Sequence, residues 1–493
     1  MYNDWLWFGV SFFVLNGLLI TASLLGRSGF LPFTTSTKIF QILAGLICFL
    51  SPYFFESKYL VILLAFLFFL IALFARKLNF LFQVLADSKG SVYFPVSFAV
   101  LAFFYWDTDV AILQVSMLVV GLGASFSSLI GRNLHNSHPL HWLNPVKSAE
   151  GSAALMITAY FIILAAGFTG FLSKLTFFEL VQIATLIGIV AALTDALFAG
   201  GTEKLFIPLV TALFIDYLLV DPAEVTRLWI IIFGILPVGW LSWRLKFLSG
   251  NGSAAMFLMA VIILGMGGWA WAIPLILFFV LSSFLTLLSH KLRRSAGDFV
   301  EKSGPRDQVQ VLANGGVPLI IFLVAMNNMW PWSYVIFIVA VASAAADTWS
   351  TEIGQLFGRG QPFDILKWKP VEKGKSGGIS IPGLAGGLAG AVTISSVLFF
   401  QTDYYFENPW NFWILAVVTG FSGSLIDSIL GSAFQVHFSC RICGRETEID
   451  EHCGVSGRVV KGFRIINNDS VNFLSIAIAS GLGIFAYLLF IRP

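Results

Sequence analysis

Four acidic residues lie within or at the ends of apolar segments in the C-terminal half of the chain: Asp347, Glu352, Asp427 and Asp469. An ionised carboxylate is costly in hydrocarbon, so such residues usually face a polar cavity or a partner. Carboxylates from separate helices can hold Mg²⁺ on nucleotide phosphates, and phosphoryl transfer mainly requires positioning and charge neutralisation. We therefore predict these four as catalytic residues, with Mg²⁺ at Asp347 and Asp427. The structural alternatives are a helix cap for Asp469, a basic partner for Glu352 and polar helix–helix contacts for Asp427.

Two paired glycines precede apolar segments of the same half and are candidate phosphate-binding sites. A helix start offers unpaired amide hydrogens, and glycine lets a phosphate approach the backbone closely. Together with two asparagines before the last apolar segment, the candidate phosphate- and nucleotide-binding residues here are Asn314, Gly315, Gly316, Lys375, Ser376, Gly377, Gly378, Asn467 and Asn468. The alternative is that Gly-Gly only absorbs a turn at the membrane surface. The string Gly374-Lys375-Ser376 is not a P-loop, because residue 369 is lysine and no strand precedes it.

A cluster of soft ligands occupies one polar loop between residues 437 and 469. Its pattern is Cys440-x2-Cys443-x8-His452-Cys453, which predicts a closed structural zinc site. The adjacency of His452 and Cys453 strains chelation from one short loop, and the alternative is three free thiols in a reducing compartment.

The first half carries two further polar motifs. Lys147 and Glu150 lie in the string 144–152, and Gly200-Gly201-Thr202-Glu203-Lys204 precedes Pro208-Leu209. We predict Lys147 and Glu150 as nucleotide-binding residues, while a surface ion pair between them is the alternative. His135, His138 and His141 are spaced by three residues, but Pro139 interrupts a helix there, so exposed loop histidines are favoured over a metal site.

The elements that position these residues are membrane helices. The 493 residues are 57% hydrophobic and 11% charged, with a mean hydropathy of +0.86, whereas soluble domains are about 25% charged. A net charge of +2 leaves no basic face for nucleic acid. The apolar runs are continuous rather than alternating, which favours helices over a barrel.

We predict an all-α polytopic membrane protein with about 14–16 transmembrane helices in two fused bundles. The candidate runs are 5–25, 37–54, 58–75, 91–105, 110–130, 152–172, 177–197, 205–219, 228–244, 252–266, 268–289, 311–328, 332–350, 379–400, 411–436 and 470–490.

Basic residues give the orientation of these helices. The segments 290–310, 351–378 and 437–469 hold fifteen of the 29 Lys and Arg residues. Short basic loops stay on the cytoplasmic side during insertion. With two spans between each pair of these segments, all three are expected on the cytoplasmic face. The first run starts without a basic region or a cleavage site, so we interpret it as a membrane helix and not a signal peptide.

Four strings in the second half resemble an integral-membrane family of unknown function, domain-of-unknown-function family ninety-two, which includes plant phytyl-phosphate kinases. They are residues 345–354, 377–380, 423–431 and 467–472, and the resemblance spans about 295–490. It implies phosphorylation of a membrane-embedded isoprenoid monophosphate by a nucleoside triphosphate. On this basis, residues 291–493 form a phytyl-phosphate kinase-like bundle that carries the Cys/His loop.

Residues 80–220 more weakly resemble CTP-dependent phytol and dolichol kinases, through the Lys-Ser-x-Glu-Gly-Ser string at 147–152 and the residues before Pro208-Leu209. The glycine-rich helix at 121–128 lacks the aspartates of those kinases, and Glu203-Lys204 stands where they have Asp-Asn. The bundle 1–290 is therefore either degenerate or uses Asp195, Glu150 and Glu203 instead.

The predicted function is an isoprenoid phosphate kinase, with prenol kinase activity in the first half if that half is active. The expected partners are a nucleoside triphosphate, by resemblance CTP, an isoprenoid alcohol or monophosphate, and the lipid bilayer. The alternative is a transporter or lipid flippase in which Asp427 and Asp195 are ion sites.

Overall fold

The chain folds into two compact units, Met1–Gly234 (unit 1) and Ile235–Pro493 (unit 2). The computed structural model describes residues 2–75, 90–134, 137–172, 175–295, 304–327, 330, 332–358, 360–400 and 409–490. Several residues that bear on the predictions above lie outside the described residues: His135, Lys302, Arg359, most of the turn near residue 329 and the whole of 401–408. The division differs from the boundary expected near residue 290. The bundles are predicted from the sequence to divide at this basic segment, into 1–290 and 291–493, but the helix that precedes the segment packs against the helices that follow.

Unit 1 consists of helices with one short hairpin. The helices are α1 (Tyr2–Arg27), α2 (Phe33–Leu50), α3 (Lys58–Ala75), α5 (Gly90–Tyr105), α6 (Val110–Leu118), α7 (Ala124–Asn133), α8 (Ala149–Phe168), α9 (Phe177–Leu197) and α10 (Glu203–Val220). A π-helical turn, Val119–Gly123, joins α6 to α7, and β1 (Pro139–Leu140) pairs with β2 (Asn144–Ser148). The unit boundary falls inside α11 (Glu224–Arg244).

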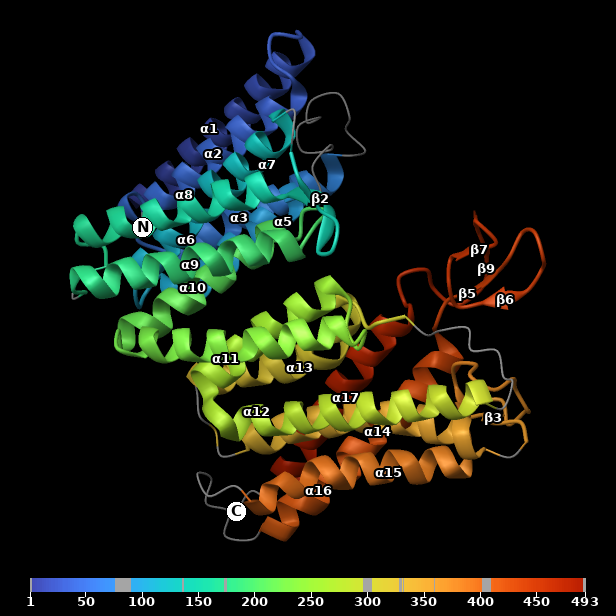
Figure 1. The fold of residues 1–493 in the computed structure, drawn as a ribbon. Coiled ribbons are helices and arrows are strands. Elements are labelled where there is room, and N and C mark those ends of the chain that lie inside the picture. Colours follow the sequence, from blue (N-terminus) through green and yellow to red (C-terminus); the bar gives the residue numbers. More distant parts are fainter. Residues whose placement is uncertain are drawn as a thin grey trace. The chain divides into compact units, whose positions relative to one another are not determined.

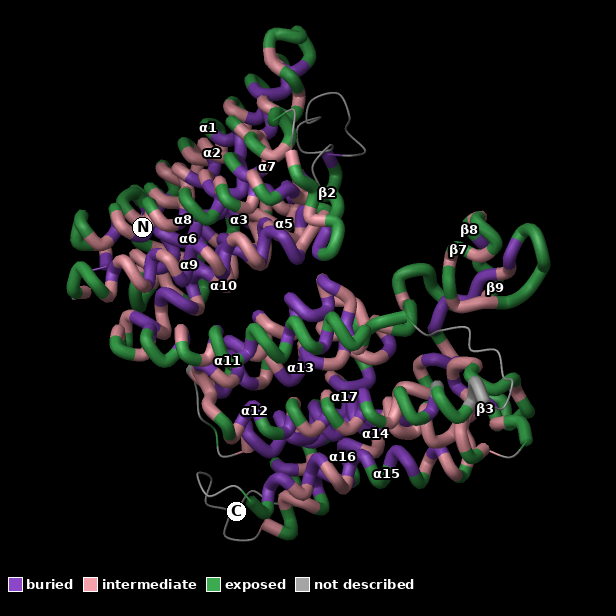
Figure 2. Tube along the Cα trace, viewed as in Figure 1, coloured by how far each residue is buried: buried purple, intermediate pink, exposed green. Residues whose placement is uncertain are grey.

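Unit 2 is built around one buried helix. Its helices are α12 (Gly250–Ser295), α13 (Gln308–Asn327), α14 (Ser333–Phe357), α15 (Ile381–Ser395), α16 (Pro409–Ala433) and α17 (Asn468–Phe490). All residues of α14 from Ser333 to Ala346 are buried, and α12, α13, α15, α16 and α17 all pack against it (Figure 2). The helix that carries Asp347 and Glu352 is therefore the centre of the bundle.

Thirteen helices within the described residues are long and apolar enough to cross a membrane. Residues 250–289 count as one of them, but the backbone at Gly268 is non-helical, with φ of 73° and ψ of −168°, so α12 consists of two helical segments that correspond to the predicted runs 252–266 and 268–289. Helix α5 has only 16 residues, fewer than the ~20 that a spanning helix usually needs. Helix α10 is not one of the thirteen, because its 18 residues include three charged ones, Glu203, Lys204 and Asp216. The prediction of an all-α polytopic membrane protein is confirmed.

Large apolar side chains point outward from these helices, as expected for surfaces that meet lipid. Phe13 is 76% exposed, and Phe161 and Phe485 are each 61% exposed. Inside unit 2, small residues let helices approach closely. A Cβ on Gly386 would come within 2.8 Å of the Trp349 carbonyl oxygen, and one on Gly390 within 2.9 Å of that of Ala345. Glycine on α15 therefore allows close packing against α14.

Short strands form a small polar lobe between α16 and α17, residues 437–461, drawn in orange-red in Figure 1. Strand β5 (His437–Ser439) lies between β6 (Glu446–Thr447) and β9 (Arg458–Lys461), with both pairings antiparallel. A hairpin of β7 (Glu451–His452) and β8 (Val455–Ser456) completes this Cys/His lobe. Between α14 and α15, β3 (Phe363–Asp364) pairs with β4 (Gly378–Ile379).

Candidate functional site

The polar segments of unit 2 gather at one end of its bundle. The Lys375 ammonium lies 3.0 Å from the Glu446 carboxylate, and Ser376 donates from its amide and its hydroxyl to Glu448. The segment between α14 and α15 therefore touches the Cys/His lobe between α16 and α17. The charge of Arg306, which precedes α13, interacts with Glu352 near the end of α14. The three basic segments thus lie at the same end of unit 2, as the alternation of spans predicts.

Two aspartates from different helices form the centre of this end. Asp347 on α14 and Asp427 on α16 are both half-buried, and their carboxyl groups interact electrostatically. The Ser475 hydroxyl on α17 donates to Asp427 Oδ2 at 3.3 Å. The side-chain amide of Asn472, oriented with its nitrogen towards these two acceptors, donates to the same oxygen at 3.1 Å and to the Asn468 carbonyl at 3.2 Å. Three helices thus supply oxygen and amide groups to one place.

This carboxylate pair, Asp347 and Asp427, differs in its surroundings from acidic residues of unit 2 such as Glu446, which pairs with Lys375. Among the described residues, no Lys or Arg forms an ion pair with either side chain. Two neighbouring carboxylates removed from bulk water repel each other unless a proton or a cation lies between them. Hard oxygen donors without a basic partner fit Mg²⁺. The residues present are therefore compatible with the predicted metal.

Glu352 and Arg306 form the outer part of the site. Glu352 lies five residues beyond Asp347 on α14, towards its C-terminal end. Two hydrogen bonds hold the backbone of Arg306. Its amide donates to the Phe247 carbonyl at 3.1 Å, and its carbonyl accepts from the Ser249 amide at 2.9 Å. The structural alternative for Glu352, a basic partner, thus has a candidate in Arg306.

The residues at the start of α17 have separate roles. Asn467 Oδ1 accepts hydrogen bonds of 2.9 Å from the amide and the hydroxyl of Ser470, so it caps the helix. The Asn468 carbonyl accepts from Asn472. Asp469 lies in the first turn, one turn before Asn472. Asn467 is engaged in capping, whereas Asn468 and Asp469 lie on the helix turn next to the carboxylate pair.

The first glycine pair is not at a helix start. Helix α13 begins at Gln308, so Gly315 and Gly316 lie inside it and their amides belong to the helix. A Cβ on Gly315 would come within 2.6 Å of Met259, and one on Gly316 within 3.3 Å of Phe473. The expectation of exposed amides at this pair is wrong, because these glycines serve helix packing. The Asn314 side chain donates to the Gln310 carbonyl of its own helix at 3.0 Å.

The second glycine pair lies in a loop that touches the end of α16. Helix α15 begins at Ile381, with Ser380 as its cap, and Gly377 has φ +85°. A Cβ on Gly377 would come within 2.5 Å of Ser432, and one on Gly431 within 3.2 Å of Ser376. These glycines let the loop rest directly on α16. Gly377 and Gly378 thus lie next to the helix start without forming its first turn.

Asp364 and Glu446 hold the same loop in place. Asp364 is 4% exposed and accepts from the Ser432 hydroxyl at 2.7 Å and from the amides of Leu366 and Lys367. Burial alone would raise the pKa of Asp364, but these hydrogen bonds together hold it below its usual value. The hydrogen bond from Lys375 likewise lowers the pKa of Glu446. Lys375 and Ser376, predicted as phosphate ligands, are therefore paired with carboxylates of the lobe.

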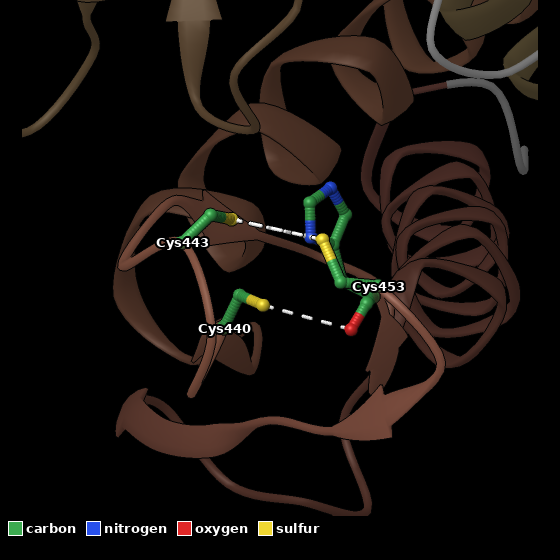
Figure 3. Close-up of side chains that lie close together, drawn as sticks. Cys440, Cys443 and Cys453 are labelled. Carbon is green, nitrogen blue, oxygen red and sulfur yellow. Dashed lines mark hydrogen bonds between the residues drawn. The ribbon is translucent and has the colours of Figure 1, made fainter.

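The four soft ligands of the Cys/His lobe converge. One donor atom from each of Cys440, Cys443, His452 and Cys453 lies within 4.8 Å of the others. His452 Nδ1 is 3.5 Å from Cys443 Sγ and 3.2 Å from Cys453 Sγ, and the two sulfurs are 4.0 Å apart (Figure 3). A hydrogen bond from the Cys443 amide, with further ones from His452 and Ile442, lowers the pKa of Cys440 to about 6. Within the described residues this is the one cluster of three or more Cys, His, Asp or Glu side chains whose donor atoms lie close enough together to hold a metal.

Unit 1 contains a second polar cluster, around Asp195 on α9. Asp195 is 1% exposed, and it accepts from Lys147 at 2.6 Å and from Ser127 at 2.9 Å. Lys204 on α10 is 2% exposed, and its Nζ has no hydrogen-bond partner among the described residues. The charges of Lys38 and Glu203 also act on Lys204. Asp195 is thus neutralised by a neighbouring lysine, while a second lysine is left with an unused donor.

Glu150 and the loop histidines do not join that cluster. Glu150 accepts from the amide and the ring of His138, with Nδ1 2.6 Å away. The alternative of a Lys147–Glu150 ion pair is wrong, because Lys147 reaches Asp195 instead. The His138 side chain is 82% exposed. This exposure agrees with the expectation of loop histidines.

Sequence reasoning missed Asn472, Ser475 and Arg306 as site residues. Asn472 and Ser475 are spaced by three residues on α17, so they share a helix face with the turn that contains Asp469. The sequence signal for them was the presence of polar side chains at helical spacing inside an apolar run, which is typical of polar contacts between membrane helices. Arg306 carried no signal beyond its charge, because its proximity to Glu352 depends on how α13 and α14 pack.

The helices and the intramembrane carboxylates define an integral membrane protein with a polar site at one end of its second bundle. The family of integral membrane proteins described as DUF92 matches residues 233–480, about half of the chain, and the chain belongs to this family. The match begins next to the boundary between the two units, so unit 2 corresponds to the family's domain.

Three relatives are informative. Protein PGR of Arabidopsis thaliana is 28% identical over 267 residues, covering 50% of this chain and 91% of that protein. An uncharacterized membrane protein of Methanocaldococcus jannaschii is 26% identical over 269 residues, covering 54% of this chain and 98% of the relative. The chloroplastic protein VTE6 of Arabidopsis thaliana is 22% identical over 238 residues, covering 47% of this chain and 63% of that protein. No solved structure matches the chain.

Proposed function

We propose that unit 2 transfers the terminal phosphoryl group of a nucleoside triphosphate to a membrane-embedded isoprenoid monophosphate. The observation that carries this proposal is the pair of Asp347 and Asp427, which come from separate helices and form no ion pair with a Lys or Arg in the described part of the chain. Family membership and the similarity to PGR and VTE6 support it. The resemblance to plant phytyl-phosphate kinases suggests the acceptor, and CTP is the donor that we expect.

The chain's own residues would position both phosphates. Asp347 and Asp427 would hold Mg²⁺, which neutralises phosphate charge when it is bound. Asn472 and Ser475 orient Asp427 from α17. Arg306, at the same end of the bundle, would offer a guanidinium to a phosphate. An oxygen of the lipid monophosphate forms a bond to the γ-phosphorus while the bond to the bridging oxygen breaks, which releases the nucleoside diphosphate.

The position of the site suits an amphiphilic acceptor. The carboxylate pair lies near the end of a bundle whose outer surface is apolar. We propose that the isoprenoid tail lies in the bilayer against this surface while its phosphate enters the polar end. The basic segments at that end would face the cytoplasm, where nucleoside triphosphates are present.

The direct test is a matrix of donors and acceptors with the purified full chain in detergent. CTP, ATP, GTP and UTP are each combined with Mg²⁺ and either a prenyl monophosphate or the corresponding prenol, and lipid products are identified by mass spectrometry. We expect a prenyl diphosphate from the monophosphate. If none of the four nucleotides yields a phosphorylated lipid, the proposal is wrong, and a transporter or flippase becomes the better hypothesis.

Unit 1 supports a second candidate activity, phosphorylation of the prenol. The supporting observation is the buried Lys204 ammonium, whose donors are unused among the described residues. A phosphate is an anion that could satisfy them. In the same matrix, Lys204→Met is expected to abolish the product formed from the prenol and to leave the product formed from the monophosphate unchanged. If both products persist in the variant, unit 1 has no such site.

A further inference from the structure

The Cys/His lobe has the local geometry of a closed metal site. The Ile442 amide donates to Cys440 Sγ at 3.4 Å, and the Gly444 amide donates to the Cys440 carbonyl at 3.0 Å, which folds the first two cysteines into one tight turn. Cys453 and Gly454 have φ of 54° and 74°, so the β7–β8 turn uses the left-handed region at both central positions. This hairpin turn directs the adjacent His452 and Cys453 to one point, which removes the strain expected from their adjacency.

The distances among three of the four donor atoms match a tetrahedral zinc centre, and the fourth, Cys440 Sγ, lies within 4.8 Å of them. Zn–S and Zn–N bonds of about 2.3 and 2.1 Å give tetrahedral edges of about 3.8 Å between sulfurs and about 3.6 Å between sulfur and nitrogen. The observed separations are 4.0 Å for the sulfurs of Cys443 and Cys453, and 3.5 and 3.2 Å from these sulfurs to His452 Nδ1. Thiolate and imidazole ligands in this geometry favour Zn²⁺ over hard cations.

The lobe is also tied to the loop beside the carboxylate pair. Glu446 follows Cys443 by three residues and pairs with Lys375. Glu448 accepts from the Ser376 amide and hydroxyl, at 3.1 and 2.6 Å, and from Gln435 at the end of α16, at 2.9 Å. Glu446 and Glu448 lie between the two halves of the ligand set. A metal bound by the four ligands would therefore hold the backbone that presents Glu446 and Glu448 from both sides.

We infer that one Zn²⁺ bound by Cys440, Cys443, His452 and Cys453 fixes the lobe so that Glu446 and Glu448 hold the Lys375–Ser376 segment against α16. The metal has a structural role in this arrangement, because four protein ligands leave no open position. The loop that it secures contains Gly377, which rests on Ser432 at the end of α16. This inference does not depend on the proposed phosphoryl transfer.

Metal content of the full chain tests the site. We expect about one zinc per chain, and less than about a tenth of that in Cys443→Ser and Cys453→Ser. Cys48→Ser is the matched control, because Cys48 lies on α2 in unit 1, and it should retain the metal. Replacement by Co²⁺ should give thiolate charge-transfer absorption that Cys443→Ser lacks. A zinc content that is equal in wild type and Cys443→Ser, or iron in place of zinc, would overturn the inference.

Limited trypsin cleavage after the exposed Lys373 tests the clamp. Removal of zinc by a chelator, or Cys443→Ser, is expected to raise the cleavage rate by about tenfold. Glu448→Ala should raise cleavage in the same way while the chain retains its zinc, which separates the clamp from metal binding and from global unfolding. Equal cleavage rates in wild type, chelated protein and Glu448→Ala would refute the clamp.

Discussion

The aspartates within the helices of the two units have different partners. In unit 1, Asp195 is paired with Lys147 at 2.6 Å and with a serine hydroxyl, so its charge is balanced within the protein. In unit 2, Asp347 and Asp427 act on each other, and no Lys or Arg in the described residues pairs with them. A balanced aspartate can be purely structural, whereas an unbalanced pair costs stability unless it binds something. Unit 2 therefore has the stronger indication of a cation site.

Among the described residues, the buried charged side chain with unused hydrogen-bond donors in unit 1 is basic, whereas the carboxylate pair of unit 2 is acidic. Lys204 is buried and its Nζ donates to no group that the structure describes, while Asp195 is already neutralised. Such a site would accept an anion and would hold a divalent cation poorly. If both units act on phosphate compounds, they would do so with different chemistry: a cation bound by acids in unit 2 and a lysine in unit 1.

The largest effect is expected from Asp347→Asn. Loss of one carboxylate from the pair should weaken metal binding and lower the rate of prenyl diphosphate formation by about 10³-fold. Asp216→Asn is the matched control, because Asp216 belongs to unit 1, follows Lys204 by twelve residues on α10 and accepts a hydrogen bond from Tyr105. The rate of product formation at saturating Mg²⁺ measures both variants. A rate for Asp347→Asn within a few-fold of wild type would remove Asp347 from the site.

The second prediction compares thermal stabilities in detergent without added metal. Asp195→Asn leaves Lys147 without its anion and should destabilise unit 1 by about 3 kcal/mol. Asp427→Asn relieves repulsion between carboxylates and should stabilise unit 2 by about 1 kcal/mol. The comparison thus predicts unfolding temperatures that shift in opposite directions.

A double variant provides the control for this pair. Lys147→Met combined with Asp195→Leu removes both charges, so its stability should lie closer to wild type than that of Asp195→Asn. Destabilisation by Asp427→Asn comparable to that by Asp195→Asn would show that the two aspartates are held in similar ways, which contradicts the contrast between the units.

Much of the architecture could be predicted from the sequence. Every apolar run overlaps a helix, because continuous hydrophobic stretches must form helices in a bilayer. The acidic residues in the second half were recognisable because a carboxylate in an apolar run is unusual. Their neighbours Asn472 and Ser475 required the register of α17 against α16, which the sequence does not encode locally.

Glycines and lysines were harder to interpret. Gly315 and Gly316 have the composition of a phosphate loop, but they serve contacts with Met259 and Phe473 that only helix packing creates. Lys147 was placed near Glu150 by sequence distance, yet it reaches Asp195 on another helix. The domain boundary was placed at a charged segment, although the packing of α12 against α13 and α14 assigns that helix to unit 2. In each case the deciding contact is distant in sequence.

Binding of Mn²⁺, a paramagnetic substitute for Mg²⁺, tests the central claim most directly. Electron paramagnetic resonance can count free Mn²⁺ during titration of the full chain in the presence of CTP. We predict one site that is lost in Asp347→Asn and in Asp427→Asn and retained in Asp195→Asn. Unchanged Mn²⁺ binding in both unit 2 variants, or loss of the site only in Asp195→Asn, would contradict the assignment of the cation to the pair of Asp347 and Asp427.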